Sequence, residues 1–266
     1  MIHLVGIDVD GTLLGSSGKI HPDVWDATRR ARAAGIHLAL CSGRPAFGLA
    51  LEYARGLDAE GWHVFQNGAS IVDVATGKSR SVPLPVDVVR GLIARARSTG
   101  DLLELYTDDE LANESSSPLA HEHARLLGVR FEVRPFESLT QPIVRAQWLV
   151  SHEAGRQLAA VPHPALEIAL STSPLMPETT FVGITSAGVS KGSAMRTVAD
   201  EYRIPLREVM YVGDAENDLS ALQIVGHPIA MANAAAAVLK IATRRVDHVD
   251  AGGLAQALEL AMAGRS

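Results

Sequence analysis

Apolar and polar positions alternate in blocks along the first part of the chain, and the blocks have the lengths of short strands and longer helices. Ile2–Ile7 is apolar enough for a strand that is buried on both faces. Pro22 is placed to open a helix in its first turn, and Gly35 to end it. Ile36–Cys41 repeats the apolar pattern of the first block. The predicted order is therefore strand, helix, strand.

The same alternation continues for one more unit. Pro45 is predicted to begin a second helix, and Val64–Phe65 to start a third strand. Strands that alternate with helices favour a parallel sheet with helices on both faces. The predicted fold class is therefore α/β, with a doubly wound, Rossmann-like core built on a parallel sheet.

The pattern changes after Asn67. Ser70–Val74 and Ser79–Leu84 flank a short polar turn, which predicts an antiparallel hairpin. From there to about Thr185 the apolar segments are shorter and prolines interrupt them. This stretch is typical of a mixed α+β insert.

The strand and helix rhythm resumes at Lys191. Further elements are predicted in this order: a helix to about Tyr202, a strand at Val209–Val212, a helix from Asp218, a strand at Pro228–Met231, and helices after Asn233 and Gly253. Residues 1–84 and 186–266 are therefore predicted to form one core domain. An α+β cap domain of residues 85–185 is inserted into it.

Composition and charge narrow the class of protein. The chain is 47% hydrophobic and 20% charged, which suits a globular protein with a sizeable core. With 24 basic and 30 acidic residues the net charge is −6, so neither nucleic acid nor a membrane is expected as a partner. The single cysteine, Cys41, excludes an intramolecular disulfide. Since the pattern of a signal peptide and a membrane-spanning run are both missing, a cytoplasmic location is predicted by default.

Polar clusters follow the predicted strands, where doubly wound sheets bind their ligands. The first is Asp8–Thr12. Its two carboxylates, Asp8 and Asp10, repel each other unless a cation lies between them, and an oxygen-rich cluster suits magnesium. A carboxylate can also attack phosphorus and form an acyl phosphate, while a second one protonates the leaving oxygen and activates water. Backbone N–H groups of Gly11 and Thr12 can point at a phosphate, and a plain polar turn is the alternative.

The second cluster, Ser42-Gly43-Arg44, follows the second strand. A hydroxyl and a glycine N–H at a helix start make an anion site, although serine is also a common helix cap. Arg44 is expected to face either a substrate or the solvent.

Two further clusters come from the C-terminal part of the chain. Lys191 opens a helix, where a cation opposes the helix dipole, so a nearby phosphate or carboxylate would explain it better than solvent does. Asp214 and Asp218 follow the strand at Val209–Val212. Asp214 would be a third acidic group near a metal, whereas capping of a helix could also explain Asp218.

Taken together, these four clusters resemble those of the haloacid dehalogenase superfamily, and more narrowly its Cof-type phosphatases with a large type II cap. The resemblance covers the whole chain, including an insert between the third core strand and Lys191. It implies that Asp8 is the nucleophile and a magnesium ligand. It also implies that Asp10 is the general acid/base and binds magnesium through its backbone carbonyl.

The resemblance assigns roles to the other clusters too. Ser42 would bind the transferring phosphoryl group and Lys191 would neutralise its charge. Asp214 would bind magnesium, and Asp218 would assist through water or through Lys191. The implied site residues are: catalytic, Asp8, Asp10 and Lys191; phosphate- or substrate-binding, Gly11, Thr12, Ser42, Gly43, Arg44, Asn67, Gly68 and Asn217; metal-binding, Asp8, Asp10, Asp214 and Asp218.

Two segments depart from the family pattern. Ala232 stands where relatives usually have glycine, and Asp247–Gly253 only loosely matches the usual ending. Both are expected to lie beside the site without changing its chemistry. The stretch Glu104–Glu110 is interpreted as a solvated loop, with contact to a hydroxyl-rich substrate as the alternative.

The predicted function is magnesium-dependent hydrolysis of small phosphate monoesters, sugar phosphates above all, through an aspartyl phosphate. Closure of the insert, with hinges near Leu84 and Thr185, favours small metabolites over phosphoproteins as substrates. A phosphomutase-type phosphotransferase is an alternative on the same residues. A catalytically silent phosphometabolite-binding protein is another, although such a protein has little use for an acid two residues after a nucleophile. The patterns specify no oligomeric state.

Overall fold

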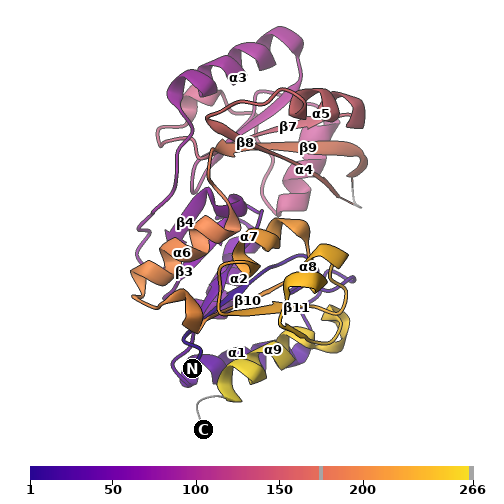
Figure 1. The fold of residues 1–266 in the computed structure, drawn as a ribbon. Coiled ribbons are helices and arrows are strands. Elements are labelled where there is room, and N and C mark those ends of the chain that lie inside the picture. Colours follow the sequence, from indigo (N-terminus) through magenta and orange to yellow (C-terminus); the bar gives the residue numbers. More distant parts are fainter. Residues whose placement is uncertain (174–175, 264–266) are drawn as a thin grey trace. The chain divides into compact units, whose positions relative to one another are not determined.

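The computed structural model describes residues 1–173 and 176–263, and it divides into two compact units (Figure 1). The first unit combines residues 1–44 and 50–80 with the chain from residue 190 onward, and the second comprises residues 45–49 and 81–189. The limits of these units differ from the predicted domain limits in two ways. The segment 45–49 belongs to the second unit, and each of the two points where the chain passes between the units is shifted by a few residues.

The first unit is built on a parallel sheet. Within the described residues its strands are β12 (Arg244–Arg245), β11 (His227–Ala230), β10 (Val209–Gly213), β1 (Leu4–Ile7) and β2 (His37–Leu40), paired in that order. All four pairings are parallel. Strands β1 and β10, from opposite ends of the sequence, are neighbours in the middle of the sheet. The predicted α/β fold class with a parallel core is confirmed.

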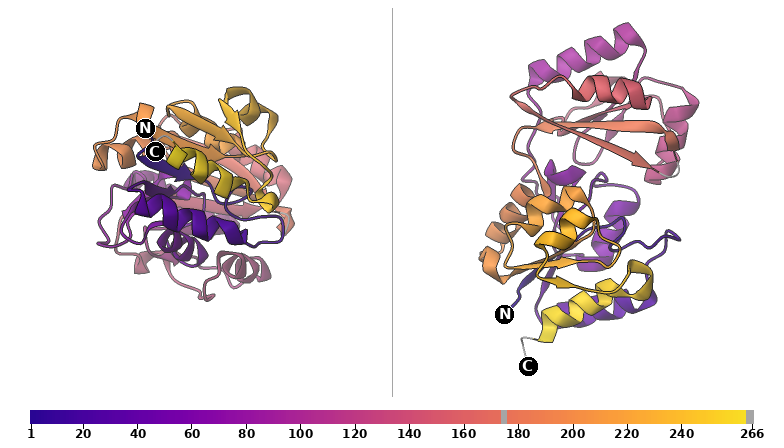
Figure 2. Two further views of the ribbon diagram at one scale, coloured as in Figure 1. Left: turned by 90° about the horizontal axis from the view of Figure 1, so that it is seen from below. Right: turned by 45° about the vertical axis from the view of Figure 1, so that its right-hand side comes forward.

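Helices cover both faces of this sheet (Figures 1 and 2). On one face α1 (Pro22–Ala33) packs against α9 (Gly253–Met262). On the other lie α6 (Lys191–Glu201), α7 (Leu219–Leu222) and α8 (Ala236–Ile241). Buried side chains of α6, among them Met195 and Val198, share one apolar cluster with Leu4 and Tyr211 of the sheet. Burial of these apolar side chains is the main force that joins the two ends of the chain.

Local signals explain where the N-terminal helices begin. Helix α1 begins at Pro22, as predicted, and Gly35 follows it with a φ of 75°. The next helix, α2, covers Leu49–Asp58, so the predicted start at Pro45 is wrong. Gly48 has a φ of 59°, a left-handed conformation that separates Pro45 from the helix.

The third strand departs from the predicted pattern. Strand β3 (Trp62–Phe65) pairs antiparallel with β4 (Ser70–Asp73) and meets the parallel sheet only at the bridge between Cys41 and Val64. The predicted hairpin between residues 70–74 and 79–84 is reduced to a single bridge, from Val72 to Ser79. Strand β4 takes its regular partner from β3 instead.

A histidine fills the gap between β2 and β3. His63 is fully buried, and its Nδ1 accepts a hydrogen bond of 3.0 Å from the Leu40 N–H. Its Nε2 lies 2.8 Å from the Asp58 carbonyl oxygen, to which it donates. A proton on Nδ1 would face the Leu40 N–H, so the ring is held neutral. Burial is the largest cause that lowers the pKa of His63, to about 4.

The second unit is an antiparallel sheet covered by three helices in its described part. Its strands are β6 (Leu111–Ala112), β5 (Leu102–Tyr106), β7 (Arg145–Val150), β9 (Met176–Ser186) and β8 (Leu166–Ser173), in that order. Two apolar clusters hold it together. One joins the sheet to α3 (Val86–Thr99) and α5 (His152–Ala159), the other to α4 (Pro118–Leu127). None of the helices described in either unit is long and apolar enough to cross a membrane.

The interpretation of Glu104–Glu110 as a solvated loop is wrong for its first residues. Glu104 lies on β5 and only 1% of it is exposed. Its carboxylate accepts from the Tyr106 hydroxyl, and one of its oxygens is 2.9 Å from His123 Nδ1. The alternation of Leu103 and Leu105 with Glu104 and Tyr106 is that of a strand with a polar network on one face.

His63 makes the stability of the protein sensitive to acid. Because its pKa is about 4 in the folded state and about 6.5 in the unfolded chain, the unfolded state binds the proton more tightly. The free energy of unfolding should therefore fall by up to about 3 kcal/mol as the pH drops from 6.5 to 4, and this contribution should be constant above pH 6.5. Urea unfolding across this range should show a weaker pH dependence for His63→Asn, whereas replacement of the exposed His163 by Asn should leave it unchanged. An unaltered slope in His63→Asn would contradict this account.

Candidate active site

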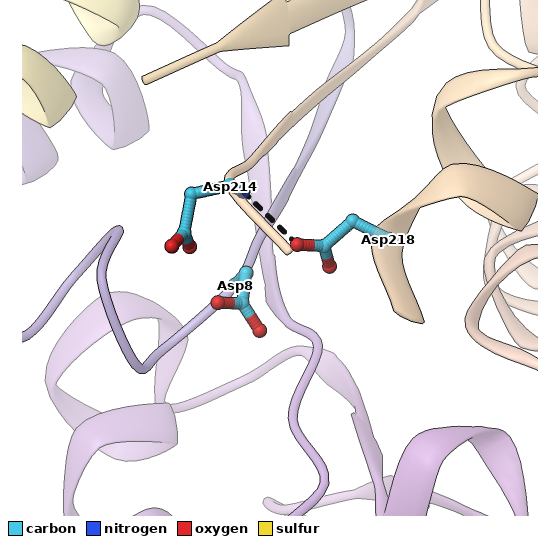
Figure 3. Close-up of side chains that lie close together, drawn as sticks. All are labelled: Asp8, Asp214 and Asp218. Carbon is cyan, nitrogen blue, oxygen red and sulfur yellow. Dashed lines mark hydrogen bonds between the residues drawn. The ribbon is translucent and has the colours of Figure 1, made fainter. Parts of the chain in front are cut away.

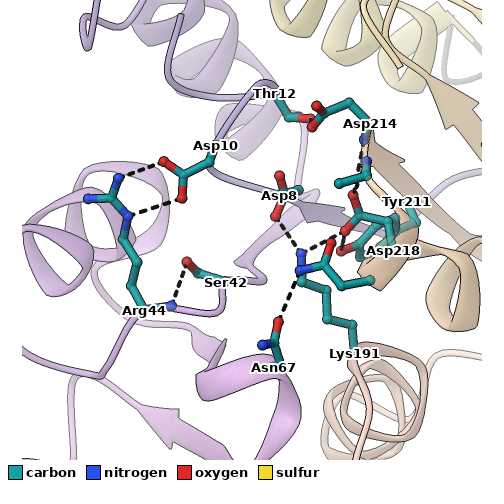
Figure 4. A network of polar contacts seen from close by, with 12 residues as sticks. Asp8, Asp10, Thr12, Ser42, Arg44, Asn67, Lys191, Tyr211, Asp214 and Asp218 are labelled. Carbon is teal, nitrogen blue, oxygen red and sulfur yellow. Dashed lines mark hydrogen bonds and ion pairs between the residues drawn. The ribbon is translucent and has the colours of Figure 1, made fainter. Parts of the chain in front are cut away.

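Polar side chains from distant parts of the sequence meet at the carboxyl ends of β1 and β10 (Figure 4). Asp8 follows β1, and its N–H continues the ladder with a 3.0 Å hydrogen bond to the Val212 carbonyl oxygen. Asp214 follows β10 directly. Because the two strands are parallel neighbours, both carboxylates emerge at the same edge of the sheet.

Lys191 joins the carboxylates of this edge. Its side chain is fully buried, and its Nζ lies 2.5 Å from Asp8 Oδ1 and 2.7 Å from Asp218 Oδ1. It is the first residue of α6, whose capping serine, Ser190, accepts from the Ser193 N–H. The unfavourable placement of a cation at a helix start is offset by these two carboxylates. Burial alone would lower the pKa of Lys191, but Asp8 and Asp218 outweigh it and raise that pKa.

The three aspartates form one compact acidic group (Figure 3). One oxygen from each of Asp8, Asp214 and Asp218 lies within 4.8 Å of the others. Burial is the largest cause that raises the pKa of Asp8 well above its ordinary value, and Asp218 adds to it. Burial likewise raises the pKa of Asp214 to about 6. Carboxylates this close resist ionisation together unless positive charge is supplied.

Asp218 differs from the other two because its oxygens are already engaged. Oδ1 accepts from Lys191 and from the Tyr211 hydroxyl, each at 2.7 Å. Oδ2 accepts from the N–H groups of Asp214 and Ala215, each at 3.0 Å. This carboxylate therefore fixes the loop after β10 and the position of the lysine.

The loop after β1 is held close to the loop after β10. Thr12 Oγ1 donates to Asp214 Oδ1 at 2.9 Å. Gly11 has a φ of 93°, and a Cβ on it would lie 2.2 Å from Asp214 Oδ2. Glycine is therefore required at position 11 both for its backbone conformation and for this close approach.

Asp10 points away from the three aspartates, toward Arg44 (Figure 4). Arg44 Nη2 donates to Asp10 Oδ1 at 2.6 Å and Nε to Oδ2 at 3.1 Å. The Asp10 side chain is 63% exposed. The sequence left substrate or solvent open as the partner of Arg44, and the structure pairs its guanidinium with the Asp10 carboxylate. The backbone N–H of Arg44 donates to Ser42 Oγ at 3.1 Å.

A strained turn after β3 carries Asn67. Gln66 and Asn67 have φ values of 54° and 56°, which side-chain-bearing residues rarely adopt. The Asn67 N–H donates to the Ser42 carbonyl oxygen at 2.9 Å, and Asn67 Oδ1 accepts from Asn217 Nδ2 at 3.1 Å. Gly68 lies so close to Ser190 that a Cβ would be 2.2 Å from the serine carbonyl oxygen. Such strain gathers at functional sites.

All predicted site residues thus lie in the first unit. Hydrogen bonds and ion pairs join Asp8, Thr12, Lys191, Asp214 and Asp218 into one group. Ser42 links the pair of Asp10 and Arg44 to the pair of Asn67 and Asn217. Which of them binds substrate or metal stays a prediction.

Two residues of this network had no predicted role. Tyr211 lies inside a strand whose pattern predicts burial throughout, so nothing in the sequence marks its hydroxyl. Asn233 Nδ2 donates to the Gly11 carbonyl oxygen at 2.8 Å, while its Oδ1 accepts from the Val249 N–H at 3.1 Å. It follows β11 closely, so the rule that marked the other clusters would have found it.

Comparison with known proteins identifies the family. The family model of the haloacid dehalogenase-like hydrolases matches residues 5–258. A Streptococcus pyogenes protein that carries a provisional phosphatase name is 27% identical over 97% of both chains. The 5-amino-6-(5-phospho-D-ribitylamino)uracil phosphatase YwtE of Bacillus subtilis is 24% identical over 98% of both.

Solved structures agree with the sequence relatives. A haloacid dehalogenase-like hydrolase from Bacteroides thetaiotaomicron superposes with a TM-score of 0.82 at 25% identity, over 98% of this chain and 99% of its own. The predicted family is confirmed. The chain belongs to the haloacid dehalogenase-like hydrolases and is a Cof-type phosphatase.

Proposed function

We propose that this phosphatase hydrolyses small phosphate monoesters, sugar phosphates above all, by transferring the phosphoryl group to Asp8 and then to water. One observation carries the proposal: Asp8 Oδ1 lies 2.5 Å from a buried lysine ammonium, within a group of three carboxylates. A nucleophilic carboxylate, a fixed cation beside it and oxygen ligands for a metal are what in-line phosphoryl transfer requires.

The acidic group fits a magnesium ion. Three carboxylates face one ammonium, and the pKa values of Asp8 and Asp214 are raised by their burial and, to a lesser extent, by the negative charge of Asp218. Oxygen-only ligand sets of this kind suit Mg²⁺. Asp8 and Asp214 would hold the ion with the Asp10 carbonyl, and Asp218 would assist from behind through water or Lys191. When bound, the ion would neutralise charge on the transferring phosphoryl group.

In the first half of the reaction an oxygen of Asp8 attacks phosphorus, and the bond from phosphorus to the substrate oxygen breaks. Asp10 gives its proton to that leaving oxygen. Lys191, the Ser42 hydroxyl and backbone N–H groups near Gly11 would bind the three other phosphoryl oxygens, whose negative charge must be stabilised. Asn67 and Asn217 would lie at the edge of the same anion site.

In the second half Asp10, now a carboxylate, takes a proton from water. The resulting hydroxide attacks phosphorus, the bond to Asp8 breaks, and inorganic phosphate leaves. In the structure both oxygens of the Asp10 side chain accept hydrogen bonds from Arg44. To act as an acid in the first half, Asp10 must turn from Arg44 toward the leaving oxygen.

Two observations support the proposed class of substrate. The named relative YwtE acts on a phosphate ester at the end of a ribityl chain, which resembles a sugar phosphate in its hydroxyl groups. The acidic net charge of this chain, −6, gives no attraction to large polyanions. A small, hydroxylated phosphate monoester fits both.

The proposal is tested by release of orthophosphate from sugar, nucleotide and cofactor phosphates, with Mg²⁺ and with EDTA. Release that requires Mg²⁺ and is fastest for a sugar phosphate is expected. An isomeric sugar phosphate in place of orthophosphate would assign the phosphotransferase instead, and binding without turnover would assign the silent binding protein.

Asp8→Asn should lower kcat by at least about a thousandfold, because an amide cannot form the acyl phosphate. The measurement is orthophosphate release by the purified variant, with its folding checked by circular dichroism. Asp23→Asn, on the exposed first turn of α1, is the matched control and should keep full activity. Activity of Asp8→Asn above a tenth of the wild-type value would exclude the nucleophile role.

Thr12→Val should raise the Mg²⁺ concentration for half-maximal activity about tenfold. The substitution keeps the shape of the side chain but removes the hydroxyl that orients Asp214, and such supporting contacts typically matter by 10- to 100-fold in metal affinity, by rough estimate. Magnesium titrations of wild type and variant check it. Thr243→Val, which removes a hydroxyl bonded to the Pro228 carbonyl, should leave the titration unchanged. Equal titrations for all three proteins would contradict the assignment of Asp214.

Asp10→Asn should discriminate between leaving groups. Its kcat/KM should fall about a hundredfold or more for a sugar phosphate, whose alkoxide needs a proton as it leaves. It should fall much less for p-nitrophenyl phosphate, because nitrophenolate leaves without one. Steady-state kinetics with both substrates are the measurement. An equal loss with the two substrates would remove the general-acid role from Asp10.

A further inference from the structure

The buried hydroxyl of Tyr211 is a polar group of the site that the chemistry described above does not use. Tyr211 lies in the middle of β10 with no exposed surface. Its hydroxyl donates to Asp218 Oδ1 at 2.7 Å, and the same oxygen accepts from Lys191 Nζ at 2.7 Å. Two donors therefore share one carboxylate oxygen (Figure 4).

The Asp218 carboxylate is not free to rotate away from these two donors. Its other oxygen accepts two backbone N–H groups, from Asp214 and Ala215, at 3.0 Å each. The residue is fully buried, so it has no direct contact with bulk water. The Tyr211 hydroxyl and the Lys191 ammonium are thus neighbours on the same fixed oxygen.

The packing around Tyr211 holds its ring in one place. Gly6 on the neighbouring strand β1 has no side chain, and a Cβ there would lie 2.6 Å from Tyr211 Cδ2. The same Cβ would lie 2.9 Å from Met195 Sδ on α6. The ring therefore fills a space that β1 leaves open and α6 closes, and its hydroxyl is aimed at Asp218.

We propose that Tyr211 is a positioning residue of the phosphatase: by occupying Asp218 Oδ1 it keeps the Lys191 ammonium shared with Asp8. The ammonium lies 2.5 Å from Asp8 Oδ1, where it can face the phosphoryl group. Without the hydroxyl, Asp218 Oδ1 has Lys191 as its one remaining donor and draws the ammonium away from Asp8. Less positive charge then reaches the transition state. The kinetic consequence rests on the proposed function, whereas the effect on anion binding does not.

Tyr211→Phe removes a single oxygen atom, and Tyr202→Phe is its matched control. The Tyr202 hydroxyl is also a hydrogen-bonding partner, and it accepts at 2.9 Å from the N–H of Trp62, which is not one of the predicted site residues. Tyr211→Phe should lower kcat for orthophosphate release about tenfold and leave KM within about twofold, as for loss of one hydrogen bond to a charged group. Tyr202→Phe should lower the Tm and leave kcat unchanged.

A double-mutant cycle separates positioning from a general structural role. Because the hydroxyl acts through Asp218, Tyr211→Phe should change kcat by less than about twofold when added to Asp218→Asn. A full tenfold loss in that background would overturn the proposal. Thermal unfolding of each variant shows that the comparison is made between folded proteins.

Binding of orthophosphate, measured by calorimetry with Mg²⁺ present, gives a readout that does not need turnover. Tyr211→Phe should raise the Kd about tenfold, and Tyr202→Phe should not. If the wild type releases no phosphate from any ester but this difference in Kd is found, the proposed function fails and the positioning role stands. If Tyr211→Phe equals the wild type in both kcat and Kd, the positioning role is wrong whatever the reaction.

Discussion

The site depends on one buried ammonium group held between two carboxylates. Lys191 lies 2.5 Å from Asp8 and 2.7 Å from Asp218, and none of the three side chains is more than 7% exposed. An unpaired charge at this depth would cost several kcal/mol. The contact also joins the two ends of the sequence, since Asp8 follows β1 while Lys191 begins α6 and Asp218 precedes α7. Fold and site therefore stabilise each other.

The four aspartates of the site have different surroundings. Asp218 is saturated by four donors and acts as a fixed support. Asp8 and Asp214 have raised pKa values, for which burial is the largest cause. Asp10 is exposed and turned toward Arg44. On the proposed function, the different environments of these aspartates would suit them to different roles: a fixed support, a metal ligand, a nucleophile and a proton carrier.

The sequence predicted the parallel sheet and the family because three of the four clusters follow strands of that sheet, and the order of these strands brings their carboxyl ends together. The sequence-based predictions were wrong where contacts between distant residues determine the local structure. Gly48 moves the start of α2, and His63 occupies the N–H that a longer pairing of β3 with β2 would have used. Glu104 lies in a buried polar network that includes His123 on α4 and Gln147 on β7, and the sequence does not show that these two residues lie beside it. The Asp10–Arg44 contact and the role of the Tyr211 hydroxyl depend on side-chain directions that no motif encodes.

The central claim, that Asp8 carries the phosphoryl group, is tested most directly by chemical trapping during turnover. The enzyme is mixed with substrate and Mg²⁺, quenched within milliseconds, reduced with borohydride and mapped by peptide mass spectrometry. An aspartyl phosphate is reduced to homoserine, so the account predicts homoserine at position 8 and unmodified aspartate at position 10. Substrate turnover that leaves position 8 unmodified at every quench time, or modification at another residue, would contradict it.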